Sequence, residues 1–330
     1  MKQALIIAVA LIIALVLTLG LAGVDVRQGL GLMMAGAFGD KFGIARTLVR
    51  ATPLLLCGLG VAVAWRAGIY NIGGEGQYLV GGLAGAGIAS GLVSTAPGAV
   101  AWIALPLSAV SGALLSSFAG WLQTKRGVPC VITTIMLNFV VVQLVAWAVR
   151  GPLQEPKHQL PLTARLPDQA MLPQPDPQTD LHMGVLLAVG LAIAVYIFLT
   201  KTKTGFLIKV VGQNSRLVKT SHYKPEAYQL LAMAMSGALC GIAGGIDYLG
   251  LVGQVGDGFS QGWGFMGIPI ALLGGLNVPG VAVSSLLFGA LMAGGDSFAR
   301  FNSIGQALVY VLQAVAVMVT LWATRRKNDS

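Results

Sequence analysis

The first constraint on the fold is an apolar run near the start of the chain, residues 4–24, which contains no charged side chain. About 20 apolar residues are enough to cross a bilayer as a helix. Similar runs recur along all 330 residues, where hydrophobic residues make up 55% and charged residues 10%. So few charges cannot cover the surface of a soluble protein, and the ~10-residue alternating pattern of a membrane β-barrel is absent. The sequence therefore predicts an all-α polytopic membrane protein.

Ten apolar segments can be placed, and they form a single transmembrane domain over residues 1–330. Lys2 and the first run resemble a signal peptide, but the run is longer than an h-region and no clean cleavage site follows. We expect it to be retained as the first membrane helix. The expected segments are 4–24, 47–64, 77–95, 99–122, 130–149, 182–200, 226–249, 263–276, 279–295 and 304–323.

The positive charges test this count, because Lys and Arg concentrate on the cytoplasmic side of membrane proteins. With the N-terminus in the cytoplasm, thirteen of the 21 Lys and Arg fall inside, whereas nine of the twelve acids fall outside or near that face. The net charge of +9 is thus explained by topology rather than by nucleic-acid binding. An even number of spans then places both termini in the cytoplasm.

Two connections differ from the rest. Residues 150–181 hold seven of the fourteen prolines and predict an extra-cytoplasmic loop over the membrane surface, or a plain spacer. Residues 201–225 carry six cations and form the largest cytoplasmic loop. Asn214 and Ser215 can cap a short surface helix over about 212–222, and Pro225 can open the next span. The loop's cations are also consistent with the positive-inside rule alone.

Enzymatic chemistry has little support in the sequence. No G-x-x-x-x-G-K-[ST] loop for ATP and no H-E-x-x-H occur, and a G-x-S-x-G elbow at a strand–helix turn is absent. Cys57, Cys130 and Cys240 lie in apolar stretches without metal-binding spacing, so we expect small buried side chains and no metal site. No catalytic residue is predicted.

The stretch Gly68–Gly82, GIYNIGGEGQYLVGG, interrupts the hydrophobic pattern with Asn71, Glu75 and Gln77. Non-helical backbone at membrane depth survives only where protein or a water-filled cavity surrounds it. Two interpretations of Glu75 stay open. It lies at the cytoplasmic interface and pairs with Arg66 or a helix N-terminus, or it lies at depth near a pathway.

A second such stretch, Gly250–Gly264, includes Gln261 and Trp263. The first break falls between segments two and three, and this one falls between seven and eight. Paired breaks at corresponding places in two inverted halves indicate a transport site between repeats. The alternative is that the small residues only allow tight helix packing.

In the fifth segment, Thr134 and Asn138 are four residues apart and share a helix face. A threonine can bond back to its own helix. An amide facing lipid is costly, so Asn138 is expected to face another helix or a cavity.

These stretches resemble permease subunits of ABC importers in the branched-chain amino acid, simple sugar and nucleoside group. The likeness rests on 53–77, VITTIMLN at 131–138, GQNSRLVKTSHY at 212–223 and GIPIALLGGLNVPG at 267–280. TIMLN and EGQ are similar to the nucleoside-type members. The loop departs from the usual form, because Leu217-Val218 and His222-Tyr223 stand where that form has other residues.

The resemblance implies a bacterial inner-membrane protein that binds no cofactor itself. A partner ATPase would bind ATP and Mg²⁺, a second, paralogous permease would complete the pathway, and an extra-cytoplasmic lipoprotein would deliver the solute. Pathway candidates are Asn71, Glu75, Gln77, Thr134, Asn138, Gln261 and Trp263. ATPase-coupling candidates are Gly212, Gln213, Asn214, Ser215, Arg216, Lys219 and His222.

Three alternatives remain at this point. The first is a simple-sugar importer of the same architecture. The second is an ion-coupled secondary transporter, for which Glu75 and Asp247 would be the carboxylates. The third is a membrane scaffold that transports nothing.

Overall fold

The computed structural model describes residues 25–302 together with residues 314 and 318. The first expected segment (4–24), nearly all of the tenth (304–323) and both chain ends lie outside the described residues. Ten spans and cytoplasmic termini therefore stay predictions.

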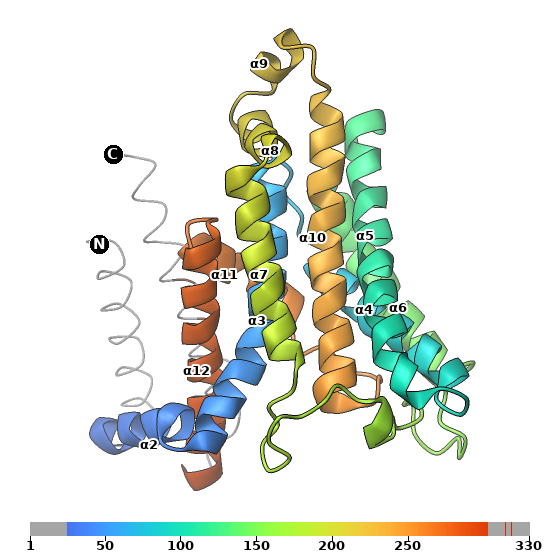
Figure 1. The fold of residues 1–330 in the computed structure, drawn as a ribbon, viewed down its shortest axis with the longest axis vertical. Coiled ribbons are helices and arrows are strands. Elements are labelled where there is room, and N and C mark those ends of the chain that lie inside the picture. The colour runs from blue at the N-terminus through green and yellow to red at the C-terminus, as the bar shows by residue number, and fades with distance from the viewer. Residues whose placement is uncertain (1–24, 303–313, 315–317, 319–330) are drawn as a thin grey trace.

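The described residues form an all-helical bundle (Figure 1) with isolated β-bridges in place of a sheet. Its α-helices, in chain order, are α2 (Val26–Phe38), α3 (Lys41–Arg66), α4 (Gly74–Leu92), α5 (Val100–Arg126), α6 (Cys130–Arg150), α7 (Gly184–Lys201), α8 (Lys203–Gln213), α9 (Ser215–Thr220), α10 (Pro225–Asp247), α11 (Trp263–Leu273) and α12 (Val278–Asn302).

Six of these helical stretches are long and apolar enough to cross a membrane: Lys41–Arg66, Pro97–Arg126, Cys130–Arg150, Gly184–Lys201, Pro225–Val252 and Val278–Arg300. They correspond to the expected segments 47–64, 99–122, 130–149, 182–200, 226–249 and 279–295. The other two expected segments, 77–95 and 263–276, correspond to α4 and α11. These two helices begin in the protein interior instead of at a membrane surface.

The directions of the helices sort the charges. α3, α5 and α7 end, and α10 begins, at the end of the bundle where α8 and α9 lie (Figure 1). We call this the basic end, because nine of the described cations lie there: Arg66, Lys125, Arg126, Lys201, Lys203, Lys209, Arg216, Lys219 and Lys224. Of the described acids only Glu226 lies there. The segregation expected from the sequence is therefore present in three dimensions, and Glu75 is the exception described below.

Helices α5 and α10 pack closely against each other, and their backbones approach through small residues. A Cβ added to Gly112 would lie 2.2 Å from the carbonyl oxygen of Gly237. The Ser116 hydroxyl donates to the Met233 carbonyl of α10. Small residues that let backbones approach, with hydroxyls bonded across, are the usual means of holding membrane helices together.

Two boundaries differ from the expectation. The 13-residue helix α2 is too short for a hydropathy pattern to reveal, and it lies across the end of the bundle opposite the basic end (Figure 1). The short surface helix expected over about 212–222 is present as α9 with Asn214 as its cap, but it is shorter, because Gly212 and Gln213 belong to the end of α8. The Asn214 backbone is extended (φ −153°) and its side chain caps α9 by accepting from Leu217 N–H.

Candidate functional site

The first break is shorter than the sequence suggested. Only Ala67–Gly73 is non-helical, whereas Gly74–Gly82 already belongs to α4. Gly68 adopts a left-handed φ of +74°, and a Cβ there would lie 3.2 Å from the Gly212 Cα at the end of α8. Glycine is therefore required where the chain turns back into the bundle beneath α8.

Asn71 organises this break from within. Its amide donates to Gln77 at 3.0 Å and to the Ser236 hydroxyl of α10 at 2.9 Å. Its carbonyl oxygen accepts from Gly73 N–H and from the Gln77 amide. Asn71 and Gln77 are each 1% exposed, and their amides bond to each other, to the backbone of the break and to α10.

Helix α6 holds the same break from the other side. The Thr134 hydroxyl bonds back to the Cys130 carbonyl at 2.8 Å and accepts from Ile72 N–H. The Asn138 amide donates to the Ile72 carbonyl at 3.0 Å, and its oxygen accepts from Gly76 N–H at 2.9 Å. Asn138 therefore faces a neighbouring chain segment, and it satisfies backbone groups that the broken helix leaves free.

The second break contains less helix than the first. A π-helical turn, Tyr248–Val252, ends α10, and residues 253–262 are non-helical before α11 starts at Trp263. The proline-rich loop pairs with it: Thr163 N–H donates to Val255 O, and Leu172 N–H donates to Leu249 O. This loop is therefore more than a spacer, because it supplies the backbone partners of the second break.

The two breaks meet where α4 and α11 begin. The Glu75 carboxylate accepts from Gly264 N–H at 3.0 Å, and a Cβ on Gly264 would lie 2.1 Å from the Glu75 nitrogen. Glu75 is 7% exposed. Its partner is thus a helix N-terminus, one of the two partners expected, but in the interior rather than at the cytoplasmic interface with Arg66. A carboxylate stabilises the positive end of a helix dipole.

The pathway candidates therefore separate into two groups. Asn71, Glu75, Gln77, Thr134 and Asn138 gather around the first break and its junction with α11, and all five are buried. Trp263 is buried at the start of α11, and Gln261 is exposed two residues earlier. No hydrogen bond joins these last two to the first group among the described residues. Their contact with a transported solute stays a prediction.

One buried pair was missed by the sequence reasoning. The Tyr78 hydroxyl donates to the Asp247 carboxylate at 2.6 Å, and Tyr78 stacks on Phe259 with ring centroids 5.4 Å apart. The other Asp247 oxygen has no partner among the described residues. The pair ties α4 to the end of α10 beside the second break. In the sequence, Asp247 stood out as an acid within an apolar span, but nothing indicated that Tyr78 would be its partner.

His182 is a second buried polar group that the sequence did not single out. It is 1% exposed, it precedes α7, and neither ring nitrogen has a partner in the described part of the chain. Burial lowers the pKa of His182 to about 4, although Asp180 acts in the opposite direction. The ring packs on the π-helical turn, since a Cβ on Gly250 would lie 2.5 Å from its Nδ1. Neutral His182 therefore joins the start of α7 to the second break.

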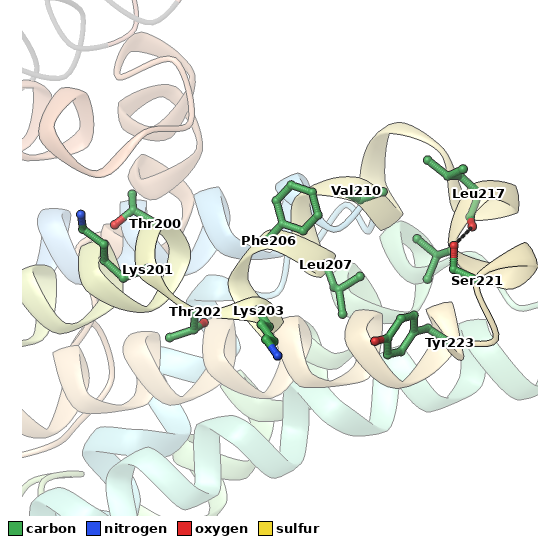
Figure 2. A pocket seen from close by; sticks show the side chains of 11 residues that line it. Thr200, Lys201, Thr202, Lys203, Phe206, Leu207, Val210, Leu217, Ser221 and Tyr223 are labelled. Carbon is green, nitrogen blue, oxygen red and sulfur yellow. Dashed lines mark hydrogen bonds between the residues drawn. The ribbon is translucent and has the colours of Figure 1, made fainter.

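The coupling candidates lie at the basic end. A groove of about 590 Å³ opens there between α8 and α9 (Figure 2), and Lys201, Lys203, Phe206, Leu217 and Tyr223 line part of it. Asn214, Ser215, Arg216, Lys219 and His222 lie on or beside α9, and all of them are exposed. Lys219 also forms an ion pair of 3.5 Å with Glu226. Gly212 and Gln213 instead end α8, where Gly212 packs on the Arg66 backbone.

The cysteines form no disulfide bond. Cys57, Cys130 and Cys240 are free and buried. In the described residues no group of three or more His, Cys, Asp or Glu could hold a metal ion.

A bundle of apolar helices with two interrupted helices joined in its interior defines a polytopic membrane protein of the transporter type. The chain belongs to the family described as branched-chain amino acid transport system / permease component, whose model matches residues 43–321. The family resemblance seen in the sequence is thus confirmed.

Relatives of known annotation are also ABC permeases. A glucose ABC transporter permease protein of Haloferax volcanii is 34% identical, with 89% of this chain and 80% of that protein covered. A guanosine ABC transporter permease protein of Bacillus subtilis is 30% identical (90% and 86% covered). A nucleoside ABC transporter permease protein of Lactococcus lactis is 28% identical (86% and 80% covered).

Proposed function

We propose that this chain is the permease subunit of an ATP-driven importer for nucleosides in a bacterial inner membrane. It would form half of the pathway and hydrolyse no ATP itself. A cytoplasmic ATPase, a second permease and an extra-cytoplasmic binding lipoprotein would complete the complex, with ATP and Mg²⁺ held by the ATPase.

The observation that carries the proposal is the exposed surface of α8 and α9 at the basic end, which we call the coupling surface. Leu217 is 55% exposed and Phe206 is 64% exposed there, beside Arg216 and the ammonium groups of Lys201 and Lys203. Apolar anchors within a charged rim are typical of a protein interface. The chain has no phosphate-binding loop of its own, so a partner ATPase would supply the energy.

The nucleoside assignment is supported by the TIMLN and EGQ motifs and by the guanosine and nucleoside permeases among the relatives. The similar glucose permease of Haloferax volcanii favours a simple sugar as the second candidate. Both solutes are uncharged and rich in hydroxyl groups, so the same kind of pathway would serve either.

A paralogous second permease is supported by the relatives in one organism. Two guanosine ABC transporter permease proteins of Bacillus subtilis match this chain, at 30% and 25% identity. Two similar permeases in one organism fit a pathway built from two different subunits.

The experiment is uptake by the assembled complex in proteoliposomes, with candidate partners taken from the neighbouring genes. Labelled guanosine, uridine, glucose and ribose are offered with and without ATP. We expect ATP-dependent uptake of a nucleoside; uptake of glucose or ribose alone would select the sugar importer. Uptake by this chain without the ATPase would contradict the proposal and favour the ion-coupled transporter.

A matched pair of variants tests the coupling surface. Arg216→Glu reverses an exposed charge on α9, and Lys157→Glu reverses one in the opposite loop. We expect Arg216→Glu to reduce uptake at least fivefold and to weaken co-purification of the ATPase, while Lys157→Glu leaves co-purification unchanged. Equal behaviour of the two variants would remove the coupling assignment.

A further inference from the structure

Among the described residues, all buried side-chain polar atoms except those of His182 and one oxygen of Asp247, which lie beside the second break, already have hydrogen-bond partners. Asn71, Gln77, Thr134 and Asn138 form their hydrogen bonds within the first break or with the helices packed on it, and Glu75 accepts one from the start of α11. A solute crossing the membrane therefore needs polar groups on the outside of this bundle.

Among the side-chain amides of the candidate spans, one lies on the outer surface of the bundle. The six candidate spans contain four Asn or Gln residues: Gln123, Asn138, Gln143 and Gln229. Gln123 accepts from Cys130 N–H, Asn138 bonds the first break, and Gln229 donates to Ala67 O. Gln143 is the one exposed amide of the four, and no described residue bonds to it.

Gln143 also lies well within the length of α6 rather than at its end. It is seven residues before Arg150, the last residue of α6, which places it roughly 10 Å inside that end of the helix. An amide exposed to hydrocarbon lacks hydrogen-bond partners and is costly. The exposed faces of α5 and α7 at comparable depth carry apolar side chains such as Leu107, Val110 and Val189.

The surroundings of Gln143 suit an uncharged ring compound. Ile132, Met136, Phe139 and Trp147 share its face of α6, at helical spacings of three and four residues, and each is more than half exposed. Aromatic rings and a thioether pack against flat or weakly polar surfaces. From Cys130 to Val149, α6 has no charged side chain, so nothing there would pair with an ionic solute.

We propose that the face of α6 formed by Ile132, Met136, Phe139, Gln143 and Trp147 lines the solute pathway, with Gln143 as the side chain that hydrogen-bonds the uncharged solute in transit. This inference rests on the proposed function and adds to it a specificity-determining residue. Water would fill this side of α6 between solutes, and the second permease would close the pathway opposite it.

Thiol labelling tests whether water reaches this face. The native cysteines are buried and give a low background. Gln143→Cys is compared with Val189→Cys, which places a thiol on the exposed face of α7 at a similar distance from its end. In the assembled complex, a membrane-impermeant, charged thiosulfonate should react at least tenfold faster with the Gln143→Cys variant. Guanosine or glucose, added separately, should slow this reaction when it is the transported solute.

Uptake supplies the second readout. Gln143→Leu should reduce uptake at least tenfold with the complex assembled and the ATPase active, and Gln143→Asn should restore part of it. Equal, slow labelling of the two cysteine variants would place the α6 face in lipid and overturn the inference. So would unchanged uptake by Gln143→Leu, or loss of complex assembly in that variant, which would indicate a helix contact. If the wild-type complex showed no ATP-dependent uptake, the proposed function would be refuted instead. The ratio of the two labelling rates would still show whether water reaches this face of α6.

Discussion

The carboxylate of Glu75 accepts a hydrogen bond from the backbone N–H of Gly264, 189 residues further along the chain. This contact joins the first turns of α4 and α11, the two helices that begin inside the bundle. One break enters from the basic end and the other from the opposite end, as expected of halves with inverted orientation. The Glu75 carboxylate thus occupies the N-terminus of α11, so an anionic solute cannot bind there.

Replacing Glu75 tests this junction. Glu75→Ala removes the acceptor and the negative charge at the start of α11, so we expect a loss of about 2 kcal/mol of stability and a lower melting temperature in detergent. Glu75→Gln keeps an acceptor and should cost less. Equal melting temperatures for both variants and wild type would show that the contact does not hold the junction.

Gly264 tests the same junction from the other helix. A Cβ there would lie 2.1 Å from the Glu75 nitrogen, so Gly264→Ala should force α4 and α11 apart and cost about 1–3 kcal/mol. Gly87→Ala on α4 is the matched control, because nothing lies within 4 Å of its added Cβ. Thermal unfolding of the two variants should differ, with Gly87→Ala neutral or slightly stabilised. Similar losses in both would contradict the close approach.

Asn138 is predicted to be a structural residue. From the sequence alone, Asn138 was a pathway candidate, because its amide could face a cavity. Its bonds to Ile72 O and Gly76 N–H reverse that expectation, since leucine would leave both backbone groups buried and unpaired, at about 1–3 kcal/mol each. Gln143→Leu on the same helix breaks no bond to a described residue and should keep the wild-type melting temperature. A stable Asn138→Leu variant that fails only in transport would return Asn138 to the pathway.

His182 predicts a pH dependence of stability. Its folded pKa of about 4 lies below the unfolded value of about 6.5, so the neutral form is the one that the fold favours. The contribution to stability is complete above pH 6.5 and is lost as the pH falls from there towards 4, by at most about 3 kcal/mol. We expect the melting temperature of wild type to fall between pH 7 and pH 4.5, and that of His182→Leu to fall less. Parallel curves would show that His182 does not titrate with unfolding.

The apolar segments and their charges determined most of the architecture. Segments such as 99–122 and 130–149 were identified from the sequence because a membrane span needs a fixed length of apolar side chains. The placement of both breaks was also predicted, since glycine and amide side chains interrupt that pattern. Helix α2 was not predicted, because 13 residues are too few for a span, and neither was helix α8, which precedes the cap at Asn214.

The sequence by itself determined the class of protein, the described spans and the segregation of charge, because these depend on local composition and on length. Only the tertiary structure decided what the polar residues do. Asn71, Asn138 and Gln143 are all amides within apolar sequence. In the structure, Asn71 and Asn138 bond to the backbone of the first break, whereas Gln143 is exposed. Hydrogen bonds such as those of Glu75 with Gly264 and of Tyr78 with Asp247 join residues more than 160 positions apart, and no local pattern encodes which distant backbone group a side chain will meet.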